Sequence, residues 1–146
     1  MSAAPPAVRI LPMDSEVEFP NWSIEELQYD FFLQDLPFRP DGEYLYRKAG
    51  LQAEPGTLVL FQFCGALIAS AVLRDVIRFE SPRKKVYEGA IYFEPSSIRV
   101  FDPIREDVVT RIWPHVKRLG RVKWSLDPKA YTDFERELTH VETAKT

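Results

Sequence analysis

The sequence has few of the residues from which metal and redox centres are built. Its 146 residues include one cysteine, Cys64, and two histidines, His115 and His140. A single cysteine excludes an internal disulfide and disfavours a zinc cluster. The two histidines are far apart in the sequence and show no metal-ligand spacing, and neither lies close enough in the sequence to Cys64 to suggest an activated thiol. We therefore expect no metal and no cofactor.

Motifs of catalysis and of membrane targeting are absent as well. The sequence contains no Gly-rich phosphate loop and no Gly-x-Ser-x-Gly element. Its first residues, MSAAPPAVRILPMDSE, lack the charged start and the long apolar core of a signal peptide. We expect a cytoplasmic protein that makes no membrane contact, and a binding module rather than an enzyme.

Negative charge is in slight excess and is spread unevenly along the chain. The net charge is −3, made up of −6 over residues 1–73 (four Lys/Arg, ten Asp/Glu), +5 over 74–123 (twelve and seven) and −2 over 124–146 (three and five). The acidic total argues against strong non-specific binding to polyanions. The basic middle part still permits a local face that binds anions, because steering depends on the local field. A solvated surface with uneven charge is the alternative.

One stretch holds an unusual share of the apolar residues. Residues 55–73 read PGTLVLFQFCGALIASAVL, with Thr57, Gln62 and Ser70 as the clearly polar members. Interruptions and the charged pair that follows disfavour a membrane span, and many poor helix formers disfavour a helix. Two strands that turn at 64–65 fit the β-branched and aromatic residues best. Both faces of this hairpin are apolar, so we expect it to be buried on both sides.

Capping and turn signals predict helices on either side of these strands. Ser23, followed three residues later by Glu26, forms a capping-box pattern and predicts a helix over 23–34. A second helix is predicted over about 104–112, between Pro103 and Pro114. Asp127 is the predicted N-cap of a third helix. The remaining predictions are strands at 8–13, 43–48 (or a helical turn), 72–80 (continuing the hairpin or starting a new strand), 86–94, 97–101 and 122–126, with loops at 36–42 and 81–85.

These elements predict the fold class α+β, as a small β-barrel flanked by helices. The length fits a single domain, which we place at residues 7–142. Residues 1–6 and 143–146 are expected to be flexible tails.

Several segments resemble the PUA-like superfamily, and most closely its EVE-type branch. WSIEEL (22–27) resembles the family's early aromatic-Ser-x-x-x-Leu helix, and YRKAG (46–50) stands where the family has a basic loop. PGTLVLFQFCGALIASAVL resembles the signature strand pair, Gly-Asp-x-Val-x-Phe-Tyr followed by Ile-x-Gly-x-x-x-Val. The likeness covers about residues 20–80, with weaker agreement in strand order to 126. The sequence departs from the pattern at Thr57, at Phe61-Gln62-Phe63 and at Ala69 or Ser70.

The resemblance implies a PUA/EVE-like barrel that binds nucleic acid. PUA-like barrels bind RNA, and EVE-type barrels and their relatives bind DNA or RNA that carries modified bases, with the base flipped into an aromatic pocket. Some relatives are fused to HNH-type nuclease domains, as in modification-dependent restriction. The resemblance therefore implies a module that recognises a modified base in DNA or RNA, with a nuclease domain as a partner in a longer protein.

A flipped-base pocket needs stacking faces, polar groups that read base edges and cations that bind phosphates. For every candidate a structural role stays open: a core ring, a bond to the backbone, or a solvated charge. Asp30 and Glu43 are weaker candidates as edge readers. The candidate pocket residues are Trp22, Ser23, Tyr46, Gln62 and Ser70. The candidate phosphate-binding residues are Arg39, Arg47, Lys48, Arg74, Arg83, Lys84 and Lys85.

Two other functions stay open. A protein-interaction or accessory module on the same barrel agrees with the acidic parts at the two ends of the sequence. A small-molecule hydrolase related to ASCH-type amidohydrolases is the third reading, and it requires Lys48 to lie close to a buried carboxylate.

Overall fold

One mixed sheet, ordered β2-β5-β4-β3-β1-β7, forms the centre of the computed structural model, which describes residues 4–47 and 50–144. A further strand, β6, pairs with β4 and with β8. The strands are β1 (Val8–Pro12), β2 (Glu43–Tyr46), β3 (Leu58–Phe63), β4 (Ala66–Arg83), β5 (Tyr87–Phe93), β6 (Arg99–Arg105), β7 (Ser125–Leu126) and β8 (Glu142–Thr143). The helices are α1 (Ile24–Glu26), η1 (Leu27–Phe32), η2 (Leu36–Phe38), η3 (Pro40–Gly42), η4 (Pro95–Ser97), α2 (Glu106–Ile112), η5 (Pro128–Ala130) and α3 (Tyr131–Glu137).

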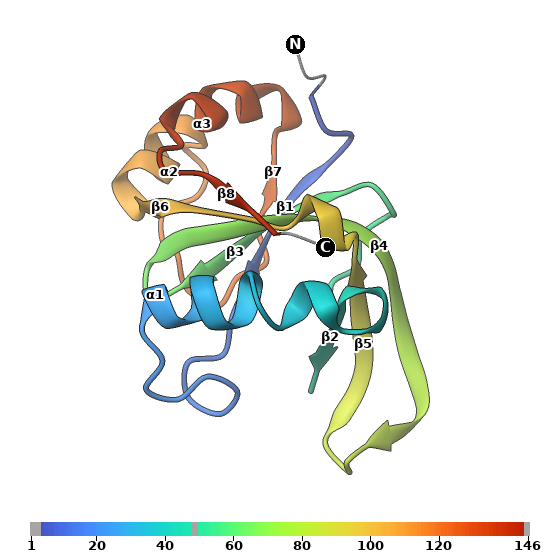
Figure 1. Cartoon of the computed structure of the whole chain (residues 1–146). Coiled ribbons are helices and arrows are strands. Elements are labelled where there is room, and N and C mark those ends of the chain that lie inside the picture. Colours follow the sequence, from blue (N-terminus) through green and yellow to red (C-terminus); the bar gives the residue numbers. More distant parts are fainter. Residues whose placement is uncertain (1–3, 48–49, 145–146) are drawn as a thin grey trace.

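The long strand β4 organises this sheet (Figure 1). Its first half pairs with β3 along one edge and with β6 along the other, and its second half pairs with β5. β1 runs parallel to β3, so the sheet is mixed. Within the described residues β2 and β7 end the main path, and the sheet is open. The structure thus confirms a protein of mixed α and β structure.

The apolar hairpin of β3 and β4 is buried on both faces, as its sequence predicts. Val59, Phe61 and Phe63 pack into a cluster with η1, while Leu58 and Leu60 pack into a second cluster with α2 and α3. Helices α1 and η1 lie on one side of the sheet and α2 and α3 on the other (Figure 1). The continuous apolar run follows from this arrangement, because neither face of the hairpin meets water.

The hairpin turns at Cys64 and Gly65, also as predicted. Their φ angles are 51° and 75°, and Phe63 pairs with Ala66 across the turn. Two positive φ angles in a two-residue loop define a type I′ turn, whose twist matches that of the strands. Glycine adopts this conformation without strain, whereas cysteine does not.

Replacing Cys64 by asparagine is therefore expected to stabilise the fold by about 0.5–1 kcal/mol, because Asn-Gly is the preferred type I′ pair. Urea unfolding of the wild type and the variant measures the difference. Cys64→Val provides the opposite case, because a β-branched residue is strained at positive φ. Equal midpoints for the asparagine and valine variants would contradict this account of the turn.

The first helix begins with the predicted capping box. Ser23 Oγ accepts from the Glu26 N–H at 3.0 Å, and the Ser23 N–H donates to Glu26 Oε1 at 3.0 Å. The helix starts as α1 and continues as the π-type turn η1, so it ends at Phe32 rather than at residue 34.

The remaining elements refine several boundaries. The predicted helix at 104–112 begins at Glu106, because Ile104 belongs to β6 and packs into the cluster under α2. Asp127 caps the short turn η5 that leads into α3, since its Oδ1 accepts from the Lys129 N–H at 3.0 Å, whereas α3 itself begins only at Tyr131. The predicted loop at 81–85 is wrong in its first three residues, because β4 continues to Arg83. Strand β7 covers only the end of the predicted 122–126 strand.

The chain is ordered further toward its end than the predicted tail at 143–146 allows. Thr143, in β8, pairs with Arg99, in β6. Ala144 is buried and donates its N–H to Ile98 O at 2.9 Å. No helix in the described part of the chain is both long enough and apolar enough to cross a membrane.

Candidate ligand-binding cleft

Two cavities that share two lining residues lie next to β1 and β2, and we call the two together the cleft. Tyr46 and Lys123 line both. We call the cavity of about 740 Å³ the large lobe and that of about 500 Å³ the small lobe. The large lobe is lined by Leu11, Pro12, Met13, Asp14, Ser15, Glu16, Val17, Glu18, Tyr44, Leu45, Tyr46, Arg47, Gln62, Cys64, Ile91, Gly120, Arg121 and Lys123. The small lobe is lined by Arg9, Tyr46, Gly50, Leu51, Gln52, Val76, Arg78, Glu88 and Lys123.

The alternation of β1 directs Arg9 toward the cleft. Val8 and Ile10 pack into the cluster with α2 and α3, and Leu11 packs into the opposite cluster. Successive side chains of a strand point to opposite faces, so Arg9 shares the face of Leu11. After β1, Asp14 Oδ1 accepts from the backbone N–H groups of Glu16 and Val17. These bonds fix the loop that lines the large lobe.

The charges in the large lobe balance among the described residues. Its three carboxylates are Asp14, Glu16 and Glu18, and its three cations are Arg47, Arg121 and Lys123. Glu18 is ion-paired with Arg47, and Glu16 with Arg121. The backbone N–H of Val17 is the main cause that lowers the pKa of Asp14, which is therefore ionised at neutral pH. A lobe with this balance suits a polar but uncharged group.

The tyrosines of the large lobe are anchored in the fold. Tyr46 donates its hydroxyl to Ile77 O at 3.1 Å and stands against Gly50 and Gly89. Tyr44 packs with Phe31, Phe61 and Phe93. Burial, and then the charges of Glu18 and Asp14, raise the pKa of the Tyr44 phenol well above its usual range, so that it stays protonated. The wall of this lobe is therefore preformed.

The small lobe is more basic. Arg9, Arg78 and Lys123 line it together with one carboxylate, Glu88. Arg9 Nη1 donates to Gln52 O at 2.7 Å, and Arg9 Nη2 donates to Lys123 O at 2.9 Å. Within residues 4–47 and 50–144, Arg9 forms no ion pair.

Of the predicted pocket residues, Tyr46 and Gln62 line the cleft, whereas Trp22, Ser23 and Ser70 lie outside its walls. Trp22 packs edge-on against Phe19 at 5.7 Å. Ser23 is occupied as the helix cap. Ser70 is fully buried and accepts from Arg99 Nε at 3.3 Å. The structure therefore gives these three residues roles in the fold.

The amide of Gln62 is also held by the backbone. In the orientation that satisfies both of its polar atoms, it donates to Gly120 O at 3.0 Å and accepts from the Gly65 N–H at 3.1 Å. It therefore ties the β3–β4 turn to the loop at Gly120, and this bond shapes one wall of the large lobe.

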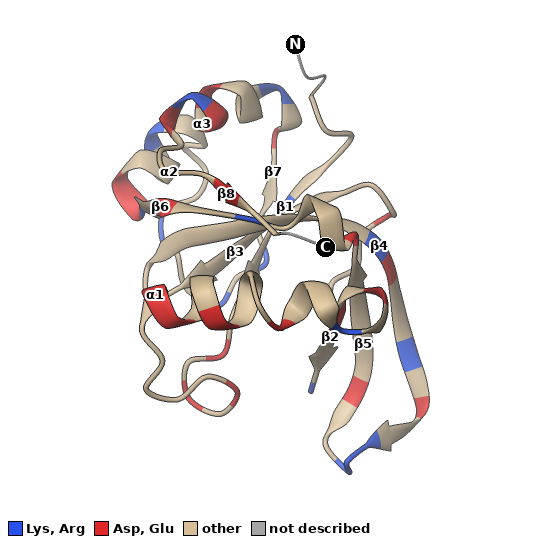
Figure 2. Ribbon diagram, viewed as in Figure 1, with Lys and Arg blue, Asp and Glu red and all other residues tan. Residues whose placement is uncertain are grey.

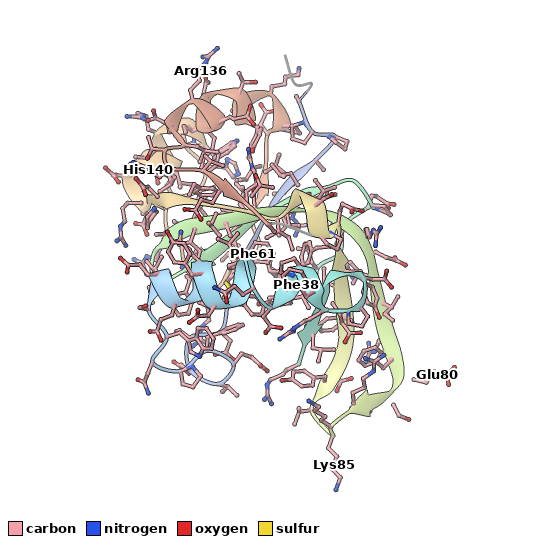
Figure 3. All side chains as sticks on the ribbon, viewed as in Figure 1. Phe38, Phe61, Glu80, Lys85, Arg136 and His140 are labelled. Atoms are coloured by element: carbon pink, nitrogen blue, oxygen red, sulfur yellow. The ribbon has the colours of Figure 1, made fainter. Side chains whose placement is uncertain are left out.

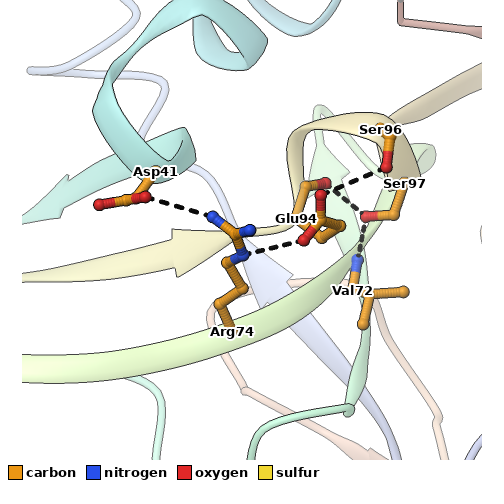
Figure 4. A network of polar contacts seen from close by, with 6 residues as sticks. All are labelled: Asp41, Val72, Arg74, Glu94, Ser96 and Ser97. Atoms are coloured by element: carbon orange, nitrogen blue, oxygen red, sulfur yellow. Dashed lines mark hydrogen bonds and ion pairs between the residues drawn. The ribbon is translucent and has the colours of Figure 1, made fainter. Parts of the chain in front are cut away.

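Four of the predicted phosphate-binding arginines are ion-paired with carboxylates. Figure 4 shows Arg74 between Asp41, at 3.2 Å, and Glu94, at 2.8 Å. A phosphate that approached these side chains would have to displace a carboxylate partner. The pairs are Arg39–Asp35, Arg47–Glu18, Arg74 with Asp41 and Glu94, and Arg83–Glu43.

The two described lysines of the set lie at the tip of a two-stranded arm. Lys84 and Lys85 form the turn between β4 and β5, with φ angles of 51° and 64°, and both are exposed. Figure 3 shows Lys85 pointing away from the body of the protein. Cationic and acidic residues are interspersed along this arm (Figure 2). Lys48 was predicted to bind phosphate, and the hydrolase hypothesis also requires it. It lies outside the described residues.

No group of three or more His, Cys, Asp or Glu residues in the described part of the chain could hold a metal ion. One titratable cluster lies well away from the arm, at His140 (Figure 3). His140 Nδ1 stands 2.6 Å from Asp102 Oδ2, which also accepts from Thr139 Oγ1 at 2.9 Å. The hydrogen bond and charge of Asp102 raise the pKa of His140, and the bond from His140 is the main cause that lowers the pKa of Asp102.

This pair gives a pH dependence of defined sign. Because the folded pKa of His140 is raised, its stabilisation is complete below the usual histidine pKa and is lost as pH rises through the raised value. An NMR titration of the His140 ring is expected to show a midpoint above the usual value of about 6.5. Asp102→Asn should return the midpoint to that value, whereas Thr139→Val should leave it raised. A midpoint unaffected by Asp102→Asn would contradict the assignment.

Sequence reasoning missed Arg9 and Lys123, the two residues that converge on the small lobe. The signal for Arg9 is present in the alternation of β1, because it is the charged residue between buried Val8 and Ile10. No such signal marks Lys123, which precedes β7 in a segment without regular structure.

No protein-family model matches the chain, and comparisons with curated proteins and with solved structures find no significant match. The resemblance to the PUA-like superfamily therefore stays a prediction.

Proposed function

We propose that this protein is a non-enzymatic nucleic-acid-binding module of the PUA/EVE-like type, with its sheet left open, and that the large lobe receives a flipped, modified base of DNA or RNA. The observation that carries the proposal is a preformed cavity of about 740 Å³ beside Tyr46. Pockets for small ligands measure roughly 300–1,000 Å³, so the lobe has room for one nucleotide.

The chemistry of the lobe supports a base as its occupant. Flipped bases are held by aromatic or apolar walls and by hydrogen bonds to their edges. Tyr46, Leu45 and Ile91 supply apolar wall, and Asp14 and Glu16 supply acceptors of the kind that bind exocyclic amino groups. The charge balance of the lobe disfavours a phosphate there, so the base rather than the backbone would enter.

Fluorescence anisotropy with labelled oligonucleotides tests the proposal. Single- and double-stranded DNA and RNA, with and without 5-methylcytosine, are titrated at low salt. We expect binding that weakens as salt rises, since phosphate contacts release counterions. If none of these oligonucleotides bound at high protein concentration, the proposal would be overturned.

A matched pair of variants links this binding to the cleft. Gly120 lines the large lobe, and a Cβ added there meets no atom within 4 Å. Gly120→Trp is therefore expected to obstruct the lobe and to lower affinity by about tenfold or more, equivalent to about 1.4 kcal/mol, without a loss of thermal stability. Gly120→Ala should bind as the wild type does. Equal affinity of Gly120→Trp and wild type would place the binding elsewhere.

A protein-interaction module is the second candidate, and the ion pairs of the four candidate arginines favour it. Their positive charge is already met by carboxylates of the same chain, which weakens a nucleic-acid footprint on that surface. The oligonucleotide titration decides between the two candidates, because only the first requires binding to nucleic acid.

A further inference from the structure

The small lobe gathers three cationic side chains, of which Lys123 also lines the large lobe. Three cations, Arg9, Arg78 and Lys123, face one carboxylate, Glu88, among the described lining residues. Glu88 stands 3.9 Å from Arg78, whose side chain is 81% exposed. The pair formed by Glu88 thus involves the outer cation, while the partners of Arg9 among the described residues are backbone carbonyls.

Arg9 is held in a fixed orientation by the backbone. Its guanidinium donates to the carbonyls of Gln52, Lys123 and Trp124, in the last case at 3.4 Å. A guanidinium has five N–H donors, so these three bonds leave one hydrogen on each Nη. Arg9 is half-buried, and in this setting of reduced solvation an anion is bound more strongly than in water.

Lys123 brings a second cation to the same lobe. Its Nζ donates to Gly50 O at 3.0 Å, and its backbone carbonyl is one of the acceptors of Arg9. Burial and then the charge of Arg9 lower the pKa of Lys123. An anion placed between the two cations would offset both effects.

We infer that the small lobe binds the phosphate group next to the base held in the large lobe, with Arg9 and Lys123 as its ligands. Because Tyr46 and Lys123 line both lobes, the base and phosphate subsites share two wall residues. This inference extends the proposed function by assigning the phosphate to residues other than the ion-paired arginines. A guanidinium fork that is already oriented suits the planar, bidentate recognition of phosphate oxygens.

NMR titration of the ¹⁵N-labelled protein with inorganic phosphate tests the inference directly. Phosphate at millimolar concentration is expected to shift the amides of Gly50 and Gln52 saturably. Sodium chloride at matched ionic strength serves as the control and should not do so. Shifts equal to those from sodium chloride, or shifts confined to Lys84 and Lys85, would overturn the inference.

Two variants with opposite expected effects make the test independent of folding. Lys123→Met should weaken phosphate binding by about tenfold, the loss expected for one charged hydrogen bond. Glu88→Gln removes the carboxylate that faces the cations among the described lining residues, and it should tighten binding several-fold, a gain that misfolding cannot imitate. Lys85→Met, at the tip of the arm, should leave the affinity unchanged. Unchanged affinity in both Lys123→Met and Glu88→Gln would refute the inference.

Parallel titrations separate this inference from the proposed function. A nucleoside, its 5′-monophosphate and an oligonucleotide are compared with phosphate alone. Oligonucleotide binding at the large lobe with no response to phosphate would overturn the inference and leave the proposed function intact. Phosphate binding with no oligonucleotide binding would overturn the proposed function and leave only the phosphate site of the small lobe.

Discussion

Replacing Gln28 by leucine is expected to destabilise the protein by about 2–4 kcal/mol, because it leaves two buried carbonyl oxygens without their donor. Gln28 is 7% exposed, and its Nε2 donates to Ile68 O at 3.0 Å and to Phe101 O at 2.6 Å. These carbonyls lie where the register between β4 and β6 shifts. The Gln28 side chain, on η1, therefore supplies hydrogen bonds where the backbone pairing of β4 with β6 is interrupted.

Urea unfolding, with its midpoint and slope, measures this loss. Gln34→Leu is the matched control, since the same change at an exposed position next to the helix should alter stability by no more than about 0.5 kcal/mol. Gln28→Glu should be more damaging than Gln28→Leu at neutral pH, because it places a carboxylate against two carbonyls. A Gln28→Leu variant as stable as Gln34→Leu would contradict this role for Gln28.

Replacing Gly89 by alanine is expected to cost about 3 kcal/mol or more and to disturb the cleft at the same time. An added Cβ at Gly89 would stand 2.2 Å from Ile77 O and 2.2 Å from the Tyr46 hydroxyl. The Ile77 backbone and the anchored Tyr46 ring both crowd the added methyl group, so it cannot move away from the clash. The hydrogen bond from Tyr46 to Ile77 O would be strained or broken.

Thermal unfolding and oligonucleotide affinity together test this expectation. Gly120→Ala is the control, since a Cβ there meets no atom within 4 Å, and it should be as stable as the wild type. If Gly89→Ala retained wild-type stability, the close contact of Tyr46 with Gly89 could not be as described.

The parts of the fold that local chemistry determines could be predicted from the sequence. The capping box at Ser23, the cap at Asp127 and the turn at Cys64–Gly65 depend on residues within a few positions of one another. The burial of the hairpin on both faces followed from its apolar residues, which occupy both faces of the two strands. In each case the pattern and the interaction that it reports lie in the same short segment.

The interactions that join distant segments could not be predicted in this way. Gln28 is bonded to two strands far along the chain, and nothing near it in the sequence marks their shifted register. Arg74 gave a basic pattern, but its partners Asp41 and Glu94 become visible only when β4 lies beside η3 and η4 (Figure 4). The number of positive charges along the sequence is therefore larger than the number that a ligand could meet unpaired.

The candidate site shows the same division. Tyr46 and Gln62 were selected from the sequence and do line the cleft. Arg9 and Lys123 were not, because they lie 114 residues apart and meet through a backbone carbonyl. The convergence of β1 with the segment before β7 creates the small lobe, and only the tertiary structure contains it.

Chemical-shift mapping with the tightest-binding oligonucleotide tests the central claim, that the large lobe receives a base, most directly. The amides of Met13, Cys64 and Gly120, which surround the large lobe, are predicted to show the largest changes. In Gly120→Trp, the amides of Met13 and Cys64 should move little. Changes confined to the turn at Lys84 and Lys85, with the cleft amides unmoved, would contradict the claim.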